Sequence, residues 1–218
     1  MTVAAVIVTR NSQRWIEPTL RSILDQERVP DRIYVVDDRS TDDTVAVCRA
    51  LLGDKDTVVQ STSTAKDTVT RIASNFRQGL VACHDVDVVV LGDHDDLWHR
   101  DRVAHQVDVL AAVPTALMVA SDGRLVDDAG QPLSGTLRTA FPVPETWAAA
   151  SPSERMRIAL RWSIATGGAS AVRPAGLADV VIPAGWLHDR WWSLVATASE
   201  SMVIDSTCVI DYRVSAQQ

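Results

Sequence analysis

The sequence predicts an α/β protein in which a mixed, mainly parallel sheet is flanked by helices. Short β-branched apolar runs alternate with helical patterns through residues 1–98, as expected for strands joined by right-handed crossovers. The run at residues 86–91 is apolar enough to be buried on both faces of a sheet. With 218 residues, 46% of them hydrophobic, and without a repeat or linker, the chain is expected to form one domain around one core.

The first half of the chain carries four predicted strands, at residues 3–9, 33–38, 57–60 and 86–91. Apolar residues at helical spacing predict a helix in each interval, at residues 16–24, 44–52 and 69–80. We expect Ser40 and Asp43 to cap the second of these helices, because this pair at this spacing is typical of a helix start. In a parallel sheet of this kind, ligands bind beyond the carboxyl ends of the strands.

The second half is less regular, and part of it is expected to be antiparallel. Helices are predicted at residues 103–111, 153–164 and 187–199, and strands at residues 116–121, 168–172 and 206–213. Between residues 121 and 133, Asp-Ala-Gly and Gln-Pro pieces indicate turns around short antiparallel strands. Residues 134–151 are rich in turn formers and show no clear element.

Composition excludes several classes of protein. The formal net charge of −7 argues against a nucleic-acid-binding surface, which requires clustered Lys and Arg. Cys48, Cys83 and Cys208 lack the spacing of a disulfide framework or a zinc site, which favours a reducing cytoplasm. We find no basic leader and no run of about 18 apolar residues. These observations are compatible with a protein that binds peripherally to the inner face of a membrane and acts on a lipid-linked substrate.

The acidic cluster formed by Asp93, Asp95 and Asp96 is the strongest functional signal. These carboxylates closely follow the apolar run at residues 86–91, and their mutual repulsion destabilises the fold unless a cation or solvent screens it. Mg²⁺ and Mn²⁺ prefer oxygen ligands and usually take one or two carboxylates together with substrate phosphates. The alternative is an acidic turn that caps the helix starting near His99, although a cap needs only one carboxylate.

Asp37 and Asp38 end the second strand in a similar way. Adjacent strand residues point to opposite sides, so we expect one carboxylate to face the site and the other to orient the loop. A carboxylate in that place can accept hydrogen bonds from a ribose or from a base imide. A structural role explains the pair equally well.

The segment GWLHDRWW, at residues 185–192, offers a general base. Asp189 is expected in the first turn of a helix, where the macrodipole favours its charged form, whereas burial beside Trp rings raises its pKa towards that of a useful base. The sequence does not decide which effect prevails. His188 competes for the role because its ordinary pKa is near neutrality. In the structural alternative, Asp189 caps the helix and the Trp residues are core.

These pieces occur in a recognisable order along the chain: VIVTRNSQRWIEPTLRSILDQ, VVDDRSTDDT, SNFRQGL, LGDHDDLW, TGG and HDRWW. In that order, from Val3 to Arg213, the sequence resembles family 2 glycosyltransferases with the GT-A fold, and most closely their rhamnosyltransferase-like branch. The resemblance implies an inverting, metal-dependent transfer of a sugar from a nucleoside diphosphate donor, with a dTDP- or UDP-sugar as the expected donor. It implies Mn²⁺ or Mg²⁺ as cofactor, and a carbohydrate, lipid-linked or small-molecule acceptor that a second subunit could help to recognise.

On the donor side, the resemblance places Thr9 and Asn11 beside the nucleotide. Asp38 then contacts the base, and Arg71 helps to hold the nucleotide. Residues 1–98 become the nucleotide-binding half of one domain, residues 1–218, and residues 99–218 its acceptor-binding half.

At the reaction centre, Asp93 and Asp95 match the acidic positions of the family's D-x-D motif, with Asp93 also at the nucleotide and Asp95 as the preferred metal ligand. Asp189 matches the proposed base. The acceptor side is assigned to His188, Trp191, Gly167 and Gly168. Two positions depart from the pattern, because His94 replaces a commoner Gln and Arg190 splits the usual H-D-W-W motif.

Three alternatives stay open. A phosphotransfer or phosphohydrolase fold usually has its nucleophilic Asp at the end of the first strand, where this chain has Thr9, Arg10 and Asn11. A nucleotidyltransferase is expected to carry a Gly-rich, basic loop there, which RNSQRW is not. A non-catalytic nucleotide-sugar or carbohydrate-binding module would keep the acidic cluster without needing Asp189.

Overall fold

The first half of the chain forms the parallel part of a mixed sheet. The computed structural model describes residues 1–214. Its first strands are β1 (Val3–Thr9), β2 (Arg32–Asp37), β3 (Thr57–Gln60) and β4 (Val88–Asp93), joined by α1 (Ile16–Leu24), α2 (Thr44–Leu51) and α3 (Thr68–Ala82). β1 lies between β2 and β4 and is parallel to both, and β3 is parallel to β2. The elements predicted for this half are confirmed.

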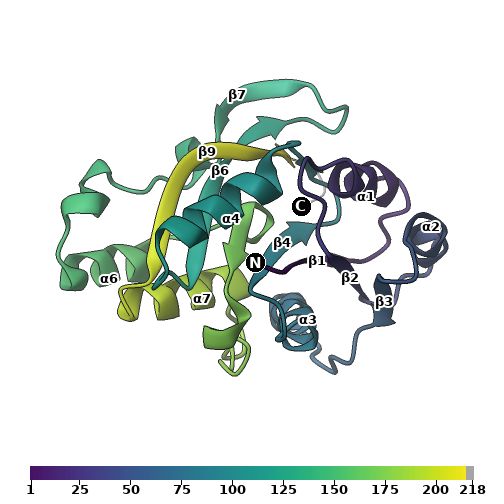
Figure 1. Cartoon of the computed structure of the whole chain (residues 1–218), viewed down its shortest axis with the longest axis horizontal. Helices are drawn as coiled ribbons and strands as arrows, with labels where there is room; N and C mark the ends of the chain where they lie inside the picture. The colour runs from purple at the N-terminus through teal and green to yellow at the C-terminus, as the bar shows by residue number, and fades with distance from the viewer. Residues whose placement is uncertain (215–218) are drawn as a thin grey trace.

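The second half adds the antiparallel part (Figure 1). Its strands are β5 (Leu97–Trp98), β6 (Met118–Val126), β7 (Pro132–Thr136), β8 (Ser170–Val172) and β9 (Met202–Arg213). Its helices are α4 (Arg102–Ala112), α5 (Leu137–Ala140), α6 (Pro152–Arg161) and α7 (His188–Ala198), with 3-10 turns at Glu145–Ala149, Gly167–Ala169 and Pro174–Gly176. Among the described residues the strand order is β3-β2-β1-β4-β8-β6-β9-β5, and β7 pairs with β6.

Two strands are longer than the sequence predicts. β6 continues through a polar stretch to Val126, and β9 begins at Met202. They pair with each other in parallel, so each satisfies the backbone groups of the other where the local pattern alone does not indicate a strand. The turn after β6 connects it to β7 as an antiparallel pair, which confirms the expected turns in this region.

The core has two parts, one on each face of the sheet. Alternate residues of β1 face opposite sides, with Ile7 in one apolar cluster and Val6 in the other. Helices α1, α2 and α4 cover the first side, and α3, α6 and α7 cover the second. Helices on both faces explain why the strands read as continuous apolar runs instead of alternating ones.

The start of α2 corrects one expectation. The side chain of Asp43 makes no cap hydrogen bond, so Ser40 and Asp43 do not form a capping pair. Ser40 instead donates its hydroxyl to Asp37 Oδ1 at 2.5 Å. Asp42 accepts hydrogen bonds from both the backbone N–H and the hydroxyl of Thr44, at 3.1 and 2.5 Å. Ser40 is therefore bonded to the buried Asp37 carboxylate and is not available to cap α2.

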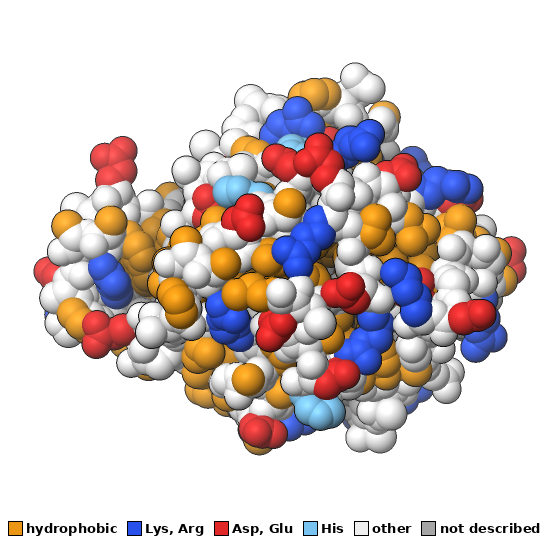
Figure 2. All heavy atoms as spheres, viewed as in Figure 1, with side chains coloured by type: hydrophobic (Ala, Val, Ile, Leu, Met, Phe, Trp, Pro, Cys, Tyr) orange, Lys and Arg blue, Asp and Glu red, His pale blue; other side chains and the backbone are white. Residues whose placement is uncertain are grey.

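The charged side chains on the face shown in Figure 2 are interspersed, acidic beside basic. On this face the net charge of −7 is therefore not gathered into a single acidic field. Within residues 1–214, none of the helices combines the length and the apolar composition that crossing a membrane requires.

Candidate active site

The carboxyl ends of β1, β2 and β4 meet at one edge of the sheet. In the register of the strands, Asp93 is the partner of Val8, and Asp37 is the partner of Thr9. Asp93 is the last residue of β4, and Asp95 and Asp96 follow it in the loop to β5. Asp95 and Asp96 are buried, with 7% and 1% of their surface exposed, and Asp93 is half-buried. The carboxylates of the acidic cluster predicted from sequence are thus close together and largely shielded from solvent.

Burial and mutual repulsion disturb the ionisation of this cluster. Burial, together with the negative charges of Asp95 and Asp189, raises the pKa of Asp93 to about 7. Burial and the charges of Asp93 and Asp95 raise the pKa of Asp96 well above its ordinary value. The buried Asp96 Oδ2 atom has no hydrogen-bond partner in the structure. An excess of negative charge with an unsatisfied oxygen suits a cation that binds through oxygen.

Two arginines lie behind the acidic cluster. Arg102, on α4, is fully buried, donates to the Leu91 carbonyl at 2.6 Å and lies 3.8 Å above the Trp98 ring centre. Burial lowers the pKa of Arg102 to about 9. Arg213, at the end of β9, donates its backbone N–H to Asp96 Oδ1 at 3.0 Å and its Nε–H to the Asp95 carbonyl at 3.0 Å. These arginines hold the loop after β4 in place.

Asp189 lies in the first turn of α7, as predicted, and faces the same edge of the sheet. Its Oδ2 atom accepts the backbone N–H of Gly167 at 2.9 Å, and its Oδ1 atom accepts that of Arg190 at 2.6 Å. Its charge is one cause of the raised pKa of Asp93, so the two carboxylates are electrostatic neighbours. The structure therefore brings the predicted base and the predicted metal ligands together from opposite halves of the chain.

Gly168 explains how these elements come so close. A Cβ atom added at Gly168 would lie 2.6 Å from Asp96 Oδ2 and 2.9 Å from Asp93 Oδ2. The backbone of Gly168 also donates a hydrogen bond to Asp93. Gly168 thus allows its backbone to lie directly against the carboxylates of the acidic cluster.

A cavity of about 140 Å³ adjoins Asp93 on the side of β1 and α3. Its lining includes Thr9, Arg10, Asp38, Arg71, Asn75, Phe76 and His94. The Arg71 Nε atom donates to Asp38 Oδ2 at 2.5 Å, and Arg10 donates to the same oxygen at 3.3 Å. Asp38 Oδ1 is buried without a hydrogen-bond partner. Asp38 faces this cavity while Asp37 holds the loop through Ser40, as expected for neighbours on a strand.

Asn11 occupies a different place from the other predicted nucleotide contacts. Its backbone has a φ of 47°, in the left-handed region that Asn tolerates better than most residues. Its Oδ1 atom accepts the backbone N–H of Thr41 at 2.8 Å, and its own N–H is donated to Ser40 Oγ at 2.8 Å. Asn11 thus joins the loops after β1 and β2 and does not line the small cavity.

Sequence comparison places this arrangement in a family. A model of glycosyl transferase family 2 matches residues 4–168, more than half of the chain. The chain belongs to glycosyl transferase family 2. It is also similar to a dTDP-rhamnosyl transferase, RfbG, of Shigella flexneri, with 27% identity over 106 residues that cover 48% of this chain and 36% of that protein. The match thus spans little more than a third of this curated relative.

Solved structures with the same fold include two that were determined in complex with UDP-sugars. TarS of S. aureus, in complex with UDP-GlcNAc, superposes with a TM-score of 0.68 and 19% identity, covering 100% of this chain and 59% of that one. Glucosyl-3-phosphoglycerate synthase from Mycobacterium tuberculosis, in complex with Mn²⁺, UDP-glucose and phosphoglyceric acid, gives a TM-score of 0.65 and 19% identity, covering 98% and 72%. The expected GT-A fold is confirmed.

In this family 2 chain, His188 is a buried packing residue. Its ring stacks on Phe76 with 3.7 Å between ring centres and meets Trp192 edge to face at 5.4 Å. Neither ring nitrogen has a hydrogen-bond partner in the structure, and burial lowers the pKa of His188 to about 4. A side chain added at Gly167 would collide with this ring. These surroundings favour Asp189 over His188 as the group that takes a proton.

Trp191 lies beside His188 on the same helix. It is half-buried and packs edge to face on Trp186, with 5.3 Å between ring centres. Its indole N–H is buried and has no partner in the structure. Trp191 thus combines core packing with an unused hydrogen-bond donor.

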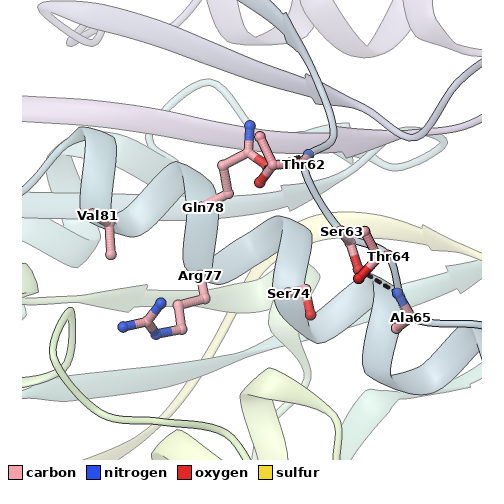
Figure 3. Close-up of a pocket in the computed structure, with 8 residues that line it drawn as sticks. All are labelled: Thr62, Ser63, Thr64, Ala65, Ser74, Arg77, Gln78 and Val81. Atoms are coloured by element: carbon pink, nitrogen blue, oxygen red, sulfur yellow. Dashed lines mark hydrogen bonds between the residues drawn. The ribbon is translucent and has the colours of Figure 1, made fainter.

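A larger cavity lies on the other side of α3, and Figure 3 shows the residues that line it. It measures about 590 Å³ and is lined by Thr62, Ser63, Thr64, Ala65, Ser74, Arg77, Gln78 and Val81. Helical spacing separates the two sides of α3, because Arg71, Asn75 and Phe76 line the small cavity instead. No carboxylate lines the larger cavity, so we assign the candidate site to the smaller one.

Sequence reasoning missed Arg102, Arg213 and Asn75. Arg102 is the first residue of α4 and lies next to the apolar face of that helix, where a charged residue is seldom found without a partner, so an Arg in that place was a usable signal. Arg213 and Asn75 carried no such signal. Arg213 depends on contacts with the loop after β4, and Asn75 on a contact with Ser61, which are distant in the sequence.

Proposed function

We propose that this chain is an inverting glycosyltransferase that moves a sugar from a nucleoside diphosphate donor to an acceptor hydroxyl. The observation that carries the proposal is the convergence of Asp93, Asp95 and Asp96 with Asp189 at one edge of the sheet. Membership of glycosyl transferase family 2 supports it. The similar proteins add support, because one is named a dTDP-rhamnosyl transferase and two structures of this fold are complexes with UDP-sugars.

A divalent cation, Mn²⁺ or Mg²⁺, is part of the proposal. No group of three or more His, Cys, Asp or Glu side chains within residues 1–214 is arranged to hold a metal by itself. These ions usually need only one or two protein carboxylates, because substrate phosphates complete the shell. Asp95 and Asp93 would hold the ion, and the raised pKa of Asp93 and the unsatisfied Asp96 oxygen fit a cation there. When bound, it would stabilise charge on the departing diphosphate.

The donor nucleotide is assigned to the small cavity beside β1. Asp38 offers a base imide N–H a buried oxygen that has no hydrogen-bond partner and lies 3.9 Å from the Arg39 guanidinium. Arg71 and Arg10 keep that carboxylate oriented through its other oxygen. Thr9 forms a hydroxyl hydrogen bond with Ser12 and closes the end of β1 next to the cavity. A dTDP- or UDP-sugar is the donor that we expect, with Asn11 acting through the loop that it joins.

In the reaction, the Asp189 carboxylate accepts the proton of the acceptor hydroxyl as its oxygen forms a bond to C1 of the sugar. The bond between C1 and the diphosphate oxygen breaks, and direct displacement inverts the anomeric centre. The backbone N–H groups of Gly167 and Arg190 fix the orientation of the carboxylate. Trp191 and the backbone of Gly167 and Gly168 border the acceptor side. Free Cys48, Cys83 and Cys208 fit a reducing cytoplasm, which completes the proposal.

Substitution of Asp189 separates this function from a non-catalytic sugar-binding module. Asp189→Asn should retain metal-dependent nucleotide binding and lose about 10²- to 10⁴-fold in transfer rate, because only the proton acceptor is removed. Asp95→Ala should weaken both. Nucleotide binding is measured by thermal shift with UDP, dTDP and GDP, each with and without Mn²⁺, and transfer by release of the nucleoside diphosphate.

Asp179→Asn is the matched control, because Asp179 is exposed and lies in the same half of the chain. It should behave as the unmodified chain in both assays. Transfer by Asp189→Asn at the unmodified rate would show that the base is wrongly assigned. Absence of a thermal shift with every nucleotide would contradict the donor site.

A further inference from the structure

An exposed apolar surface lies beside Asp189. It is formed by the end of α6, the loop before α7 and the first turn of α3, and we call it the Trp162 surface: Leu160, Trp162, Trp186, Leu187 and Val69. The exposed fractions are 53% for Leu160, 48% for Trp162 and 38% for Leu187, which is unusual for large apolar side chains. Such a grouping indicates a binding surface more than a folding requirement.

Contacts through Arg190 make this surface continuous. Its guanidinium donates to the Leu160 carbonyl at 3.1 Å and lies 5.5 Å from the centre of the Trp186 ring. Arg190 also lines a shallow hollow of about 380 Å³ together with Val69, Trp186 and Leu187. The end of α6 and the start of α7 therefore lie side by side, and Asp189 directly precedes Arg190 on α7.

The exposed charge on the Trp162 surface is positive. Arg161 lies 5.3 Å from the centre of the Trp162 ring, and Arg190 makes the corresponding contact with Trp186. Asp67, near Val69, is exposed and stays negative because the hydrogen bond from Thr70 lowers its pKa, but the exposed Lys66 beside it offsets that charge. A chain of net charge −7 thus gathers arginine and tryptophan at this place.

Arginine beside exposed tryptophan suits the boundary of an anionic bilayer. Indole rings favour the headgroup level, where one end meets hydrocarbon and the other meets water. Arg side chains attract anionic headgroups while their stems cover apolar surface. A second copy of this chain fits less well, because a twofold interface would place these arginines against one another.

We propose that the Trp162 surface binds the headgroup layer of an anionic lipid bilayer and so presents Asp189 to an acceptor embedded in that bilayer. The second part rests on the proposed function, whereas bilayer binding does not. The test mixes the purified chain, without donor, with sedimentable vesicles of phosphatidylcholine alone or of phosphatidylcholine with phosphatidylglycerol, at low and at high salt.

The unmodified chain should bind the vesicles that contain phosphatidylglycerol, and high salt should weaken this binding. Leu160→Ser combined with Trp162→Ser should lower the partition coefficient about tenfold or more, because two apolar side chains leave the bilayer. Arg161→Gln should lower it about fivefold. Val113→Ser combined with Leu133→Ser is the matched control, because both side chains are exposed apolar residues on other elements, at 38% and 44%.

Vesicle binding by the Leu160/Trp162 double variant equal to that of the unmodified chain would overturn the proposal, as would equal binding to both kinds of vesicle. The proposal is also wrong if the unmodified chain does not bind vesicles but sediments as a dimer, while the double variant sediments as a monomer. That result would show that the surface joins two copies of the chain. Thermal unfolding checks that each variant is folded. The nucleotide thermal shift, which these substitutions should not change, separates failure here from failure of the proposed function.

Discussion

Replacing Gly168 by Ala tests how closely the backbone must approach the acidic cluster. The added Cβ atom would lie 2.6 Å from Asp96 Oδ2 and 2.9 Å from Asp93 Oδ2, distances that real Cβ atoms essentially never show. Asp96 is 1% exposed and its Oδ1 atom accepts the Arg213 N–H, so this carboxylate has little room to turn away. Either the carboxylates or the segment before β8 must move.

Overpacking of a filled site costs about 1 to 3 kcal/mol of unfolding free energy. Gly168 has no positive φ, so the Ala backbone itself is unstrained, and the lower entropy of the unfolded chain returns about 0.4 to 1 kcal/mol. The net loss is about 1 to 2 kcal/mol. For a domain of this size, that lowers the melting temperature by about 2 to 8 °C. Because the displaced carboxylates are the proposed metal ligands, the Mn²⁺-dependent nucleotide shift should fall as well.

The assay is thermal unfolding of the metal-free chain, repeated with Mn²⁺ and UDP. Gly53→Ala is the control, because nothing lies within 4 Å of its added Cβ atom, and it should leave both measurements nearly unchanged. The reasoning is refuted if Gly168→Ala melts at the temperature of the unmodified chain and retains the full nucleotide shift. That result would show that the site relaxes freely around the new methyl group.

Two further predictions concern pH, and they have opposite signs. Burial lowers the pKa of His188 to about 4 in the folded chain. Between about pH 6.5 and 4 the unfolded chain therefore binds a proton at this residue and the folded chain does not. As pH falls through this range, up to about 3 kcal/mol of folding stability is lost. His188→Asn should remove that acid loss in urea unfolding followed as a function of pH; an unchanged slope would mean that the ring protonates in the folded state. The pKa of Asp93 is raised to about 7, so the folded chain keeps its proton longer than the unfolded chain and stability is lost as pH rises from about 4 to 7. Asp93→Asn should reduce this loss in metal-free protein, with the remainder coming from Asp96, whose pKa is also raised. A profile identical to that of the unmodified chain would contradict the raised pKa of Asp93.

Much of this molecule can be predicted from local patterns. The apolar runs that become β1, β2 and β4, the helical spacing of α1 and α3, and the carboxylates after β4 are properties of neighbouring residues. Asp189 was placed correctly at the start of α7 for the same reason. Parallel strands then bring their carboxyl ends to one edge, so Asp38 and Asp93 were expected close together before any coordinates.

Other features depend on contacts between residues far apart in the chain, which no local pattern encodes. β6 and β9 lengthen because each supplies backbone partners to the other. Gly168 meets Asp93 and Asp96 only because β8 lies beside β4, and the buried Arg102 supports the same group from α4. This packing determines whether a carboxylate is buried and in which direction its pKa shifts. Residue types along the chain thus indicate the chemistry that is present, whereas burial and distance between elements determine how those residues ionise and which of them meet.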